Sequence, residues 1–222
     1  MNRIIKPNIP GYLGKRISEG EHQQQDFKFA INNARKIAET LSAFANTDGG
    51  RLLIGVKDNG KIAGIRNDEE MYMVEGAADL FCKPSVNMDF QVWEYDNKRV
   101  LEVWINPSPE RPHKAKTDDN QWKAFIRVND ENFLASPIHL NYWAHQDKTD
   151  AVPDQFSTDD KKLLTFIDDN GITLNAICKK TALARKDVIT SLGAFFRWGL
   201  IELDRRNGKW HIKACAKDLS NE

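Results

Sequence analysis

The segment 43–65 constrains the fold of this chain more than any other part of the sequence. Upstream of it, apolar residues recur over 31–45 at the three-and-four spacing of a helix with one buried face, and the pair Gly49-Gly50 ends this pattern. Because glycine reaches positive-φ conformations at little steric cost, the chain can reverse there directly into the apolar run 52–56. We therefore expect a helix, a tight turn and a strand that is buried on both faces.

The residues after this strand predict a hairpin. Residues 58–60, Asp-Asn-Gly, are typical of a turn, and the run 61–65 is the expected second strand. Gly55 and Gly64 have no side chain to pack inside these strand-like runs. Their positions indicate a bulge, or the close approach of another backbone or a ligand.

The composition fits a globular chain with one medium and one small domain. The chain has 222 residues, of which 41% are apolar, so it can bury a sizeable core. No run of about 18 apolar residues occurs, and residues 1–10 lack the apolar segment of a signal peptide, so we expect a cytoplasmic protein with no membrane span. Cys82, Cys178 and Cys215 are far apart, which indicates neither a disulfide framework nor a zinc ribbon.

The first domain is expected to be of the α+β class and to span 15–145, after an irregular N-terminal arm at 1–14. Strand-like runs on both sides of the polar turn 96–98 predict an antiparallel hairpin, so the sheet should be mostly antiparallel or mixed. The other expected elements are a short strand at 26–29, a helix at 68–82, strands at 86–95, 99–105 and 122–128, a polar loop at 106–120 and a closing helix at 136–145.

A polar, proline-containing linker at 146–156 is expected to separate this domain from a smaller one at 157–217. Capping residues and apolar spacing there predict helices at 158–171, 174–180 and 185–198, and then a strand, a basic turn and a second strand over 199–213. Three helices followed by a hairpin are typical of a winged helix-turn-helix domain.

The charge of the chain is zero overall but is unevenly distributed. Within 173–217, ten lysines and arginines face three acids, a net charge of +7, and such a basic surface points toward nucleic acid. In a winged helix, the recognition helix enters the major groove and the wing lies along phosphates. The residues then expected to contact nucleic acid are Lys179, Lys180, Arg185, Lys186, Thr190, Arg205, Arg206 and Lys209. Alternatively, Phe195, Phe196 and Trp198 would form a surface for dimerisation or protein docking.

An ordered set of motifs runs through the first domain. It consists of Glu21 with Asp26-Phe27-Lys28, Ala43–Gly50, Leu53–Gly60 with Gly64-Ile65, Pro84, Val100–Val103, Arg111-Pro112 and Phe125–Val128. Over roughly 15–140, this set resembles the Schlafen-type AlbA-like domain. The resemblance implies an AlbA-like α+β fold and a nucleic-acid-binding protein similar to bacterial regulators that often carry a C-terminal winged helix.

The same resemblance raises an enzymatic alternative, because animal relatives include metal-dependent RNA endonucleases that use three carboxylates. The matching positions here are Glu21, Asp26 and Asp58. Converging carboxylates bind a hard cation such as Mg²⁺ or Mn²⁺, which can orient water and stabilise charge on a cleaved phosphodiester. This chain departs from the pattern in two ways, since Asp26 replaces the usual Glu and Lys57 stands where a second acid is common. Those nucleases also join two such lobes in one chain. This chain has one lobe, so a comparable groove would need a homodimer.

Two further sets of residues in the first domain are candidates for phosphate binding. Lys28, Arg51 and Arg127 are expected to contact the nucleic-acid backbone. A second candidate is the turn formed by Asn46, Thr47, Asp48, Gly49 and Gly50. Either these residues serve only to form the turn, or their backbone amides form a nest that holds a phosphate. No ATP is expected, because Val56 stands where the lysine of a phosphate-binding loop would be.

We therefore expect a DNA- or RNA-binding protein, a DNA-binding transcriptional regulator that acts as a homodimer without a cofactor. The alternatives are a metal-dependent ribonuclease and a ligand-sensing or protein-docking module.

Overall fold

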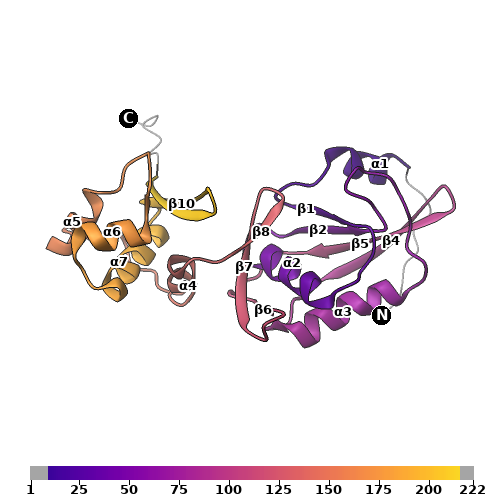
Figure 1. The fold of residues 1–222 in the computed structure, drawn as a ribbon, viewed down its shortest axis with the longest axis horizontal. Helices are drawn as coiled ribbons and strands as arrows, with labels where there is room; N and C mark the ends of the chain where they lie inside the picture. The colour runs from indigo at the N-terminus through magenta and orange to yellow at the C-terminus, as the bar shows by residue number, and fades with distance from the viewer. Residues whose placement is uncertain (1–9, 216–222) are drawn as a thin grey trace. The chain divides into compact units, whose positions relative to one another are not determined.

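The computed structural model describes residues 10–215, and the chain divides into two compact units, Met1–Leu134 and Ala135–Glu222 (Figure 1). Most of the expected N-terminal arm, residues 1–9, lies outside the described range, as does the end of the basic segment after Cys215. The rest of the arm is helical rather than irregular, because Pro10–Glu19 form helix α1. Gly11 and Gly14 concealed this helix in the sequence, since glycine lowers helix propensity.

A four-stranded sheet is the centre of the first unit. The elements are β1 (Gln25–Lys28), β2 (Gly50–Ile54), β4 (Asp89–Tyr95), β5 (Lys98–Ile105), α2 (Ala34–Asn46) and α3 (Glu69–Phe81). The strand order is β1-β2-β5-β4, in which β1 and β2 are parallel and the other neighbours are antiparallel, so the predicted mixed sheet is confirmed. Helices α2 and α3 cover one face of this sheet and α1 lies on the other (Figure 1).

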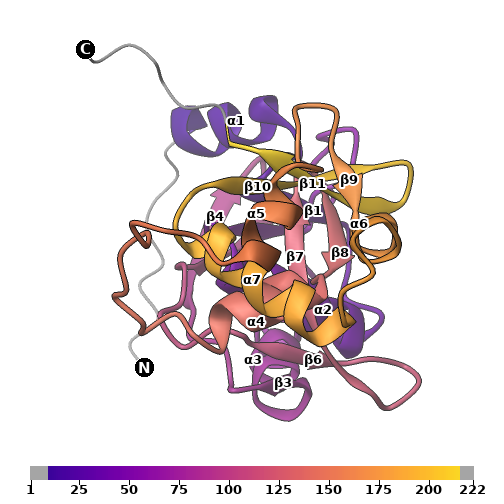
Figure 2. The same cartoon turned by 90° about the vertical axis from the view of Figure 1, so that its left-hand side faces the viewer.

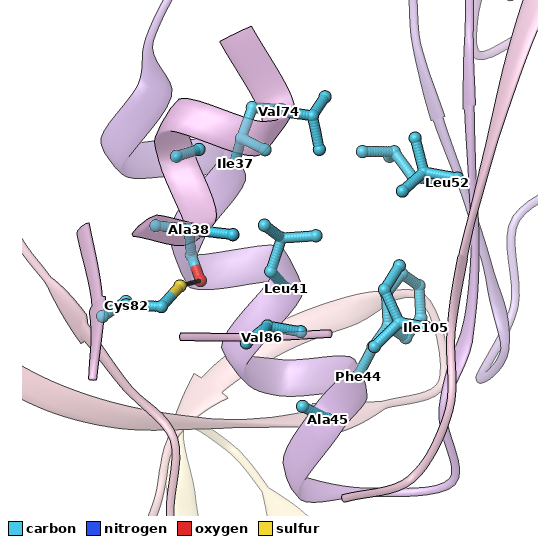
Figure 3. Close-up of a cluster of buried hydrophobic side chains, with 14 of the residues drawn as sticks. Ile37, Ala38, Leu41, Phe44, Ala45, Leu52, Val74, Cys82, Val86 and Ile105 are labelled. Carbon is cyan, nitrogen blue, oxygen red and sulfur yellow. Dashed lines mark hydrogen bonds between the residues drawn. The ribbon is translucent and has the colours of Figure 1, made fainter. Parts of the chain in front are cut away.

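The main core of the first unit lies between the sheet, α2 and α3 (Figure 3). Leu41 and Phe44 of α2 are fully buried, as are Leu52 and Ile105 of the sheet and Val74 of α3. Burying a side chain of this size stabilises the fold by about 1.5–3 kcal/mol relative to leaving it exposed. The apolar spacing over 31–45 thus predicted the buried face of α2 correctly.

A second sheet packs against α2. Its strands are β3 (Cys82–Lys83), β6 (Lys114–Lys116), β7 (Trp122–Val128) and β8 (Glu131–Leu134), in the order β3-β6-β7-β8 with antiparallel neighbours. The predicted strand β7 is confirmed. The other three were not predicted, because β3, β6 and β8 are too short to show alternation and β6 lies inside the expected polar loop.

The turn between α2 and β2 depends on two glycines. The amides of Thr47 and Gly49 both donate to the carbonyl oxygen of Phe44, which ends the helix. Gly49 has φ +68°, and a Cβ atom there would lie 2.6 Å from the carbonyl oxygen of Ile105. A Cβ atom on Gly50 would lie 2.5 Å from the ring of Phe44. Both positions therefore require glycine because of the space around them, and the first also because of its backbone conformation.

The second strand that we expected at 61–65 does not form. Val56 and Ile62 make an isolated bridge, and the amide of Gly64 donates to the carbonyl oxygen of Gly55 at 2.9 Å. A Cβ atom on Gly55 would lie 2.9 Å from the carbonyl carbon of Gly64. The predicted close approach of another backbone is therefore confirmed, and this contact replaces a regular ladder.

Within residues 135–215, the second unit combines four helices with a three-stranded sheet. The elements are α4 (Pro137–Trp143), α5 (Thr158–Leu164), β9 (Ile172–Thr173), α6 (Leu174–Thr181), α7 (Arg185–Arg197), β10 (Ile201–Arg206) and β11 (Lys209–Ala214). The sheet order is β10-β11-β9, all antiparallel, and Figure 2 shows α5, α6 and α7 beside it. The three helices and the hairpin lie where predicted, although α5 ends at Leu164 rather than near Gly171.

The segment 136–156 differs from the expectation that it closes the first domain and then forms a linker. Helix α4 packs on α7, where Ile138 joins the buried core of the second unit. In the following loop, Asp150 accepts two hydrogen bonds from Arg197 and its carbonyl oxygen accepts one from the indole of Trp198. Phe156 packs on the same core. The whole segment is therefore part of the second unit.

The three cysteines are free thiols in this structure. Cys82 is buried, and its thiol donates to the carbonyl oxygen of Ala38 at 3.6 Å (Figure 3). Burial raises the pKa of Cys82 to about 12, so the reactive thiolate is a negligible fraction at neutral pH. Within residues 10–215, no helix combines the length and the apolar character needed to cross a membrane.

The substitution Gly49→Ala is expected to lower the free energy of unfolding by more than about 1 kcal/mol, because alanine is strained at positive φ and its Cβ would meet backbone atoms that cannot move away. The measurement is urea denaturation followed by circular dichroism. As a matched control, Gly76→Ala in α3 should stabilise by about 0.5–1 kcal/mol, since nothing lies within 4 Å of that Cβ position. Equal effects of the two substitutions would contradict this account of the turn.

Candidate nucleic-acid interface

The turn between α6 and α7 presents a group of exposed cations. The hydroxyl of Thr173 caps α6, and Ala182 adopts a left-handed conformation (φ +57°) that turns the chain into α7. Lys179 and Lys180 lie in the last turn of α6, where cations are favoured by the helix dipole. The predicted contact residues Lys179, Lys180, Arg185, Lys186 and Thr190 are all exposed.

The cations at the start of α7 are electrostatically unfavourable for the helix itself. The N-terminus of a helix carries roughly half a positive charge, so Arg185 and Lys186 add to charge of the same sign. Ala184, at the N-cap position, supplies no side-chain cap, and Asp187 is the acid in that first turn. Among the described residues, neither Arg185 nor Lys186 forms an ion pair. This end of α7 is therefore suited to an anion from outside the chain.

The β10-β11 hairpin supplies the remaining predicted cations. Its turn residues, Asn207 and Gly208, both have positive φ, as a tight hairpin requires. Arg206 is exposed but pairs with Asp204 at 2.5 Å, and the half-buried Arg205 lies over the ring of Trp210 at 5.3 Å. Lys209 is exposed and borders the same cavity as Arg185, so the hairpin and the start of α7 lie close together.

The aromatic residues that we considered as a docking surface are instead packed within the second unit. Phe195 is fully buried in the core. The ring of Phe196 makes edge contacts with His139 and Tyr142, and that of Trp198 lies 6.3 Å from the ring of Phe156. These contacts leave the exposed cations as the main feature of α7.

The prediction that Arg127 contacts nucleic acid is wrong, because its side chain is almost completely buried. One guanidinium nitrogen donates to the carbonyl oxygen of Gln25 at 3.0 Å and to Oδ1 of Asp26 at 3.2 Å, and the other donates to Asn132 at 3.1 Å. The group also lies over the ring of Phe44 at 5.1 Å. Arg127 therefore joins β7 to β1 inside the first unit.

Arg51 is also buried and is unavailable to a phosphate backbone. Its guanidinium lies over the ring of Trp104 at 4.5 Å, and its Nε is 3.6 Å from the buried carboxylate of Glu102. Lys28 is about one-third exposed and pairs with Asp26 at 2.6 Å. Of the three cations predicted in the first unit, Lys28 is thus the one exposed enough to contact a phosphate.

Two of the three predicted acids lie together and the third does not join them. Glu21 accepts a hydrogen bond from the amide of Phe27, beside Asp26. Burial raises the pKa of Glu21 above its ordinary value, and the neighbouring Asp26 carboxylate raises it further. Asp26 is level with Leu52 across the parallel pair β1-β2, whereas Asp58 is on an exposed turn beyond the end of β2.

These acids do not fit a three-carboxylate metal site. The two oxygens of Asp26 face Arg127 and Lys28, so its charge is already neutralised. Among residues 10–215, no group of three or more histidine, cysteine or acidic side chains is arranged to hold a metal ion. The Lys57 and Asp26 departures noted in the sequence agree with this result.

The turn 46–50 has structural partners that argue against a phosphate nest. The amides of Thr47 and Gly49 are used inside the chain, as described above. Oδ2 of Asp48 accepts a hydrogen bond from Gln23 at 2.9 Å, and its carbonyl oxygen accepts one from Gln24 at 2.8 Å. The turn chemistry alone therefore accounts for these residues.

Two residues near the exposed cations were not predicted from the sequence. Oδ1 of Asn175, at the second position of α6, accepts a hydrogen bond from Arg185 at 2.7 Å. Trp210 follows Lys209 in β11 and borders the same cavity as Arg185. The position of Trp210 directly after a basic turn was a signal available in the sequence.

Comparison with known proteins adds a family match. The family model described as Schlafen, AlbA_2 matches residues 21–136. The DIP2311 protein from Corynebacterium diphtheriae is similar in structure over 78% of this chain, at 16% identity and a TM-score of 0.46, and this match spans 32% of the DIP2311 chain. The N-terminal domain of a protein from Nitrosomonas europaea, described as related to the ATP-dependent DNA helicase RecG, is similar over 68% of this chain and 99% of its own, at 17% identity and a TM-score of 0.43. A comparison with curated protein sequences found no match.

The substitution Arg127→Met is expected to lower the free energy of unfolding by about 3–5 kcal/mol, because it removes one of the two cations paired with the buried carboxylate of Asp26. The measurement is urea denaturation at neutral pH. In an Asp26→Asn background the same substitution should cost less, since no buried charge loses its partner. Equal costs in the two backgrounds would contradict a stabilising role for the ion pair.

Proposed function

The chain belongs to the Schlafen AlbA_2 family, and on that premise we propose that it is a nucleic-acid-binding protein that contacts duplex DNA through its second unit. The resemblance of the first unit to bacterial regulators supports nucleic acid as the class of partner. The exposed cations of α6, α7 and the β10-β11 hairpin support the second unit as the contact surface.

The order of elements in the second unit supports a winged helix-turn-helix. The series α5-β9-α6-α7-β10-β11 has the three helices and terminal hairpin of that plan. On this basis α7 is the recognition helix and the β10-β11 hairpin is the wing. Reading base edges with α7 would make the protein a DNA-binding transcriptional regulator, and a homodimer would read two half-sites.

The single observation that carries the proposal is the two adjacent cations at the start of α7, which form no ion pair within residues 10–215. Arg185 and Lys186 are exposed and act against the helix dipole, so the stability of α7 does not account for their charges. A DNA phosphate would be favoured there by both the cations and the helix end. Lys179 and Lys180 on the preceding helix would extend the contact along the backbone.

The double substitution Arg185→Ala with Lys186→Ala is expected to weaken binding to a mixed-sequence DNA duplex and to flatten its salt dependence. Each lost phosphate contact reduces the slope of log K against log salt by about 0.9, so we expect a reduction of about 2. The measurement is fluorescence anisotropy of a labelled duplex across a salt titration.

A charge-matched control separates this surface from a general effect of charge. Lys148→Ala with Lys161→Ala removes two exposed lysines of the second unit that lie outside α6, α7 and the hairpin. It should change the slope much less than the test variant. The same slope in both variants would contradict the assignment to α7, and no binding by the unaltered chain at low salt would contradict the proposal itself.

The ribonuclease alternative is tested with the same protein. Structured RNA is incubated with the chain in the presence and absence of Mn²⁺, and intact RNA is expected in both. Cleavage that needs Mn²⁺ and disappears in Glu21→Gln would overturn this expectation and favour the enzyme.

A further inference from the structure

A cavity of about 330 Å³ lies in the second unit, where α4, the start of α6, the start of α7 and β11 meet. Its volume is at the lower end of the range of about 300–1,000 Å³ that is typical of small-molecule sites. The apolar part of its lining includes the buried side chains of Ile138 and Ile212 and the half-buried Leu174 and Trp210. These residues give the cavity an apolar part with an aromatic ring on one side. Ser136, Thr173 and Asn175 also line it and add neutral polar groups.

The cations at the cavity are on its exposed side. Arg185 and Lys209 both line it and are both exposed, so they lie at its mouth. Within residues 10–215 neither forms an ion pair, and Arg185 donates a hydrogen bond to the neutral amide of Asn175, 2.7 Å away. The mouth therefore carries two positive charges that have no ion-pair partner in the described part of the chain.

The aromatic wall is held in place by its neighbours. The ring of His139 contacts the ring of Trp210 edge-on at 4.9 Å, and Arg205 lies over the ring of Trp210 at 5.3 Å. Burial lowers the pKa of His139 to about 3, so this histidine is neutral at physiological pH and adds no charge behind the wall.

We propose that this cavity binds a small organic anion with a flat apolar body, an aromatic carboxylate. The ring would lie against Trp210 between Leu174 and the two isoleucines, and the carboxylate would face Arg185 and Lys209 at the mouth. A carboxylate paired with a guanidinium forms a strong charge-assisted hydrogen bond, and the apolar walls match the ring. Nothing in the DNA-binding proposal requires a cavity of this kind.

The ligand would also regulate DNA binding, and this part of the inference rests on the proposed function. Arg185 and Lys209 are among the cations expected to contact phosphates, and one cation cannot fully serve both anions. A bound carboxylate would therefore compete with the duplex. By linkage, the duplex would lower the affinity for the carboxylate by the same factor.

The experiment uses benzoate as the probe and benzamide as its neutral analogue of the same shape. The indole N–H of Trp210 is followed by NMR in the ¹⁵N-labelled full chain, with its signal assigned from Trp210→Phe. Benzoate should give a saturable shift of this signal. Benzamide should bind at least about tenfold more weakly, because it lacks the charge. Equal affinities, or no saturable shift with benzoate, would overturn the proposal.

Two substitutions distinguish the mouth of the cavity from other surface charge. Lys209→Gln should weaken benzoate binding severalfold and leave benzamide binding unchanged. Lys180→Gln removes the same charge from an exposed position that does not line the cavity, and it should leave benzoate binding unchanged. A similar loss in both variants would overturn the assignment of the carboxylate to this mouth.

The regulatory part is tested by adding benzoate to the DNA anisotropy measurement, with benzamide in parallel. A fall in DNA affinity with benzoate alone supports competition, and an unchanged affinity at saturating benzoate overturns it. Benzoate binding by a chain that does not bind DNA would support the cavity and contradict the proposed function. DNA binding by a chain that does not bind benzoate would support the proposed function and contradict the cavity proposal.

Discussion

The first unit depends on the side-chain amide of Asn46 at the end of α2. This amide is buried, and it donates to the carbonyl oxygens of His113 and Phe125 at 2.8 and 2.9 Å and accepts from the amide of His113 at 2.8 Å. One side chain thus joins the helix to the segment before β6 and to β7. A buried polar group left without a partner costs about 1–3 kcal/mol, so each of these bonds matters to the packing of the second sheet on α2.

Those parts of the fold that have a strong period or a strong turn signal could be predicted from the sequence. The buried face of α2, the apolar strand β2 and the glycine turn between them are local patterns, and local sterics determine them. Helix α1 and strands β3, β6 and β8 could not be predicted in this way. They are short, and tertiary contacts hold them, as when Leu13 of α1 packs beside Phe27 and Leu53 on the sheet.

In the candidate site, too, some features could be predicted from local sequence and others depend on tertiary contacts. The exposure of Arg185 and Lys186 follows from their place on an amphipathic helix, which the sequence reveals. The burial of Arg51 and Arg127 does not follow from the sequence, because it depends on acids and rings that fold in from other strands. Arg127 and its partner Asp26 are 101 positions apart in the chain. Sequence alone therefore identifies the charged residues but cannot say which of them are neutralised inside the fold.

The packing of α4 on α7 decides where the chain can be divided. Gly193 of α7 leaves the space that the side chain of Asn141 fills, since a Cβ atom there would lie 2.0 Å from its Oδ1. A fragment that began at the polar stretch near residue 146 would lose α4 and leave this groove and Ile138's place in the core open to water. A fragment that began at Ala135 would keep both. The natural boundary of the second unit is thus the short connection between β8 and α4. The polar segment 146–156, which looks like a linker in the sequence, is a packed part of the second unit.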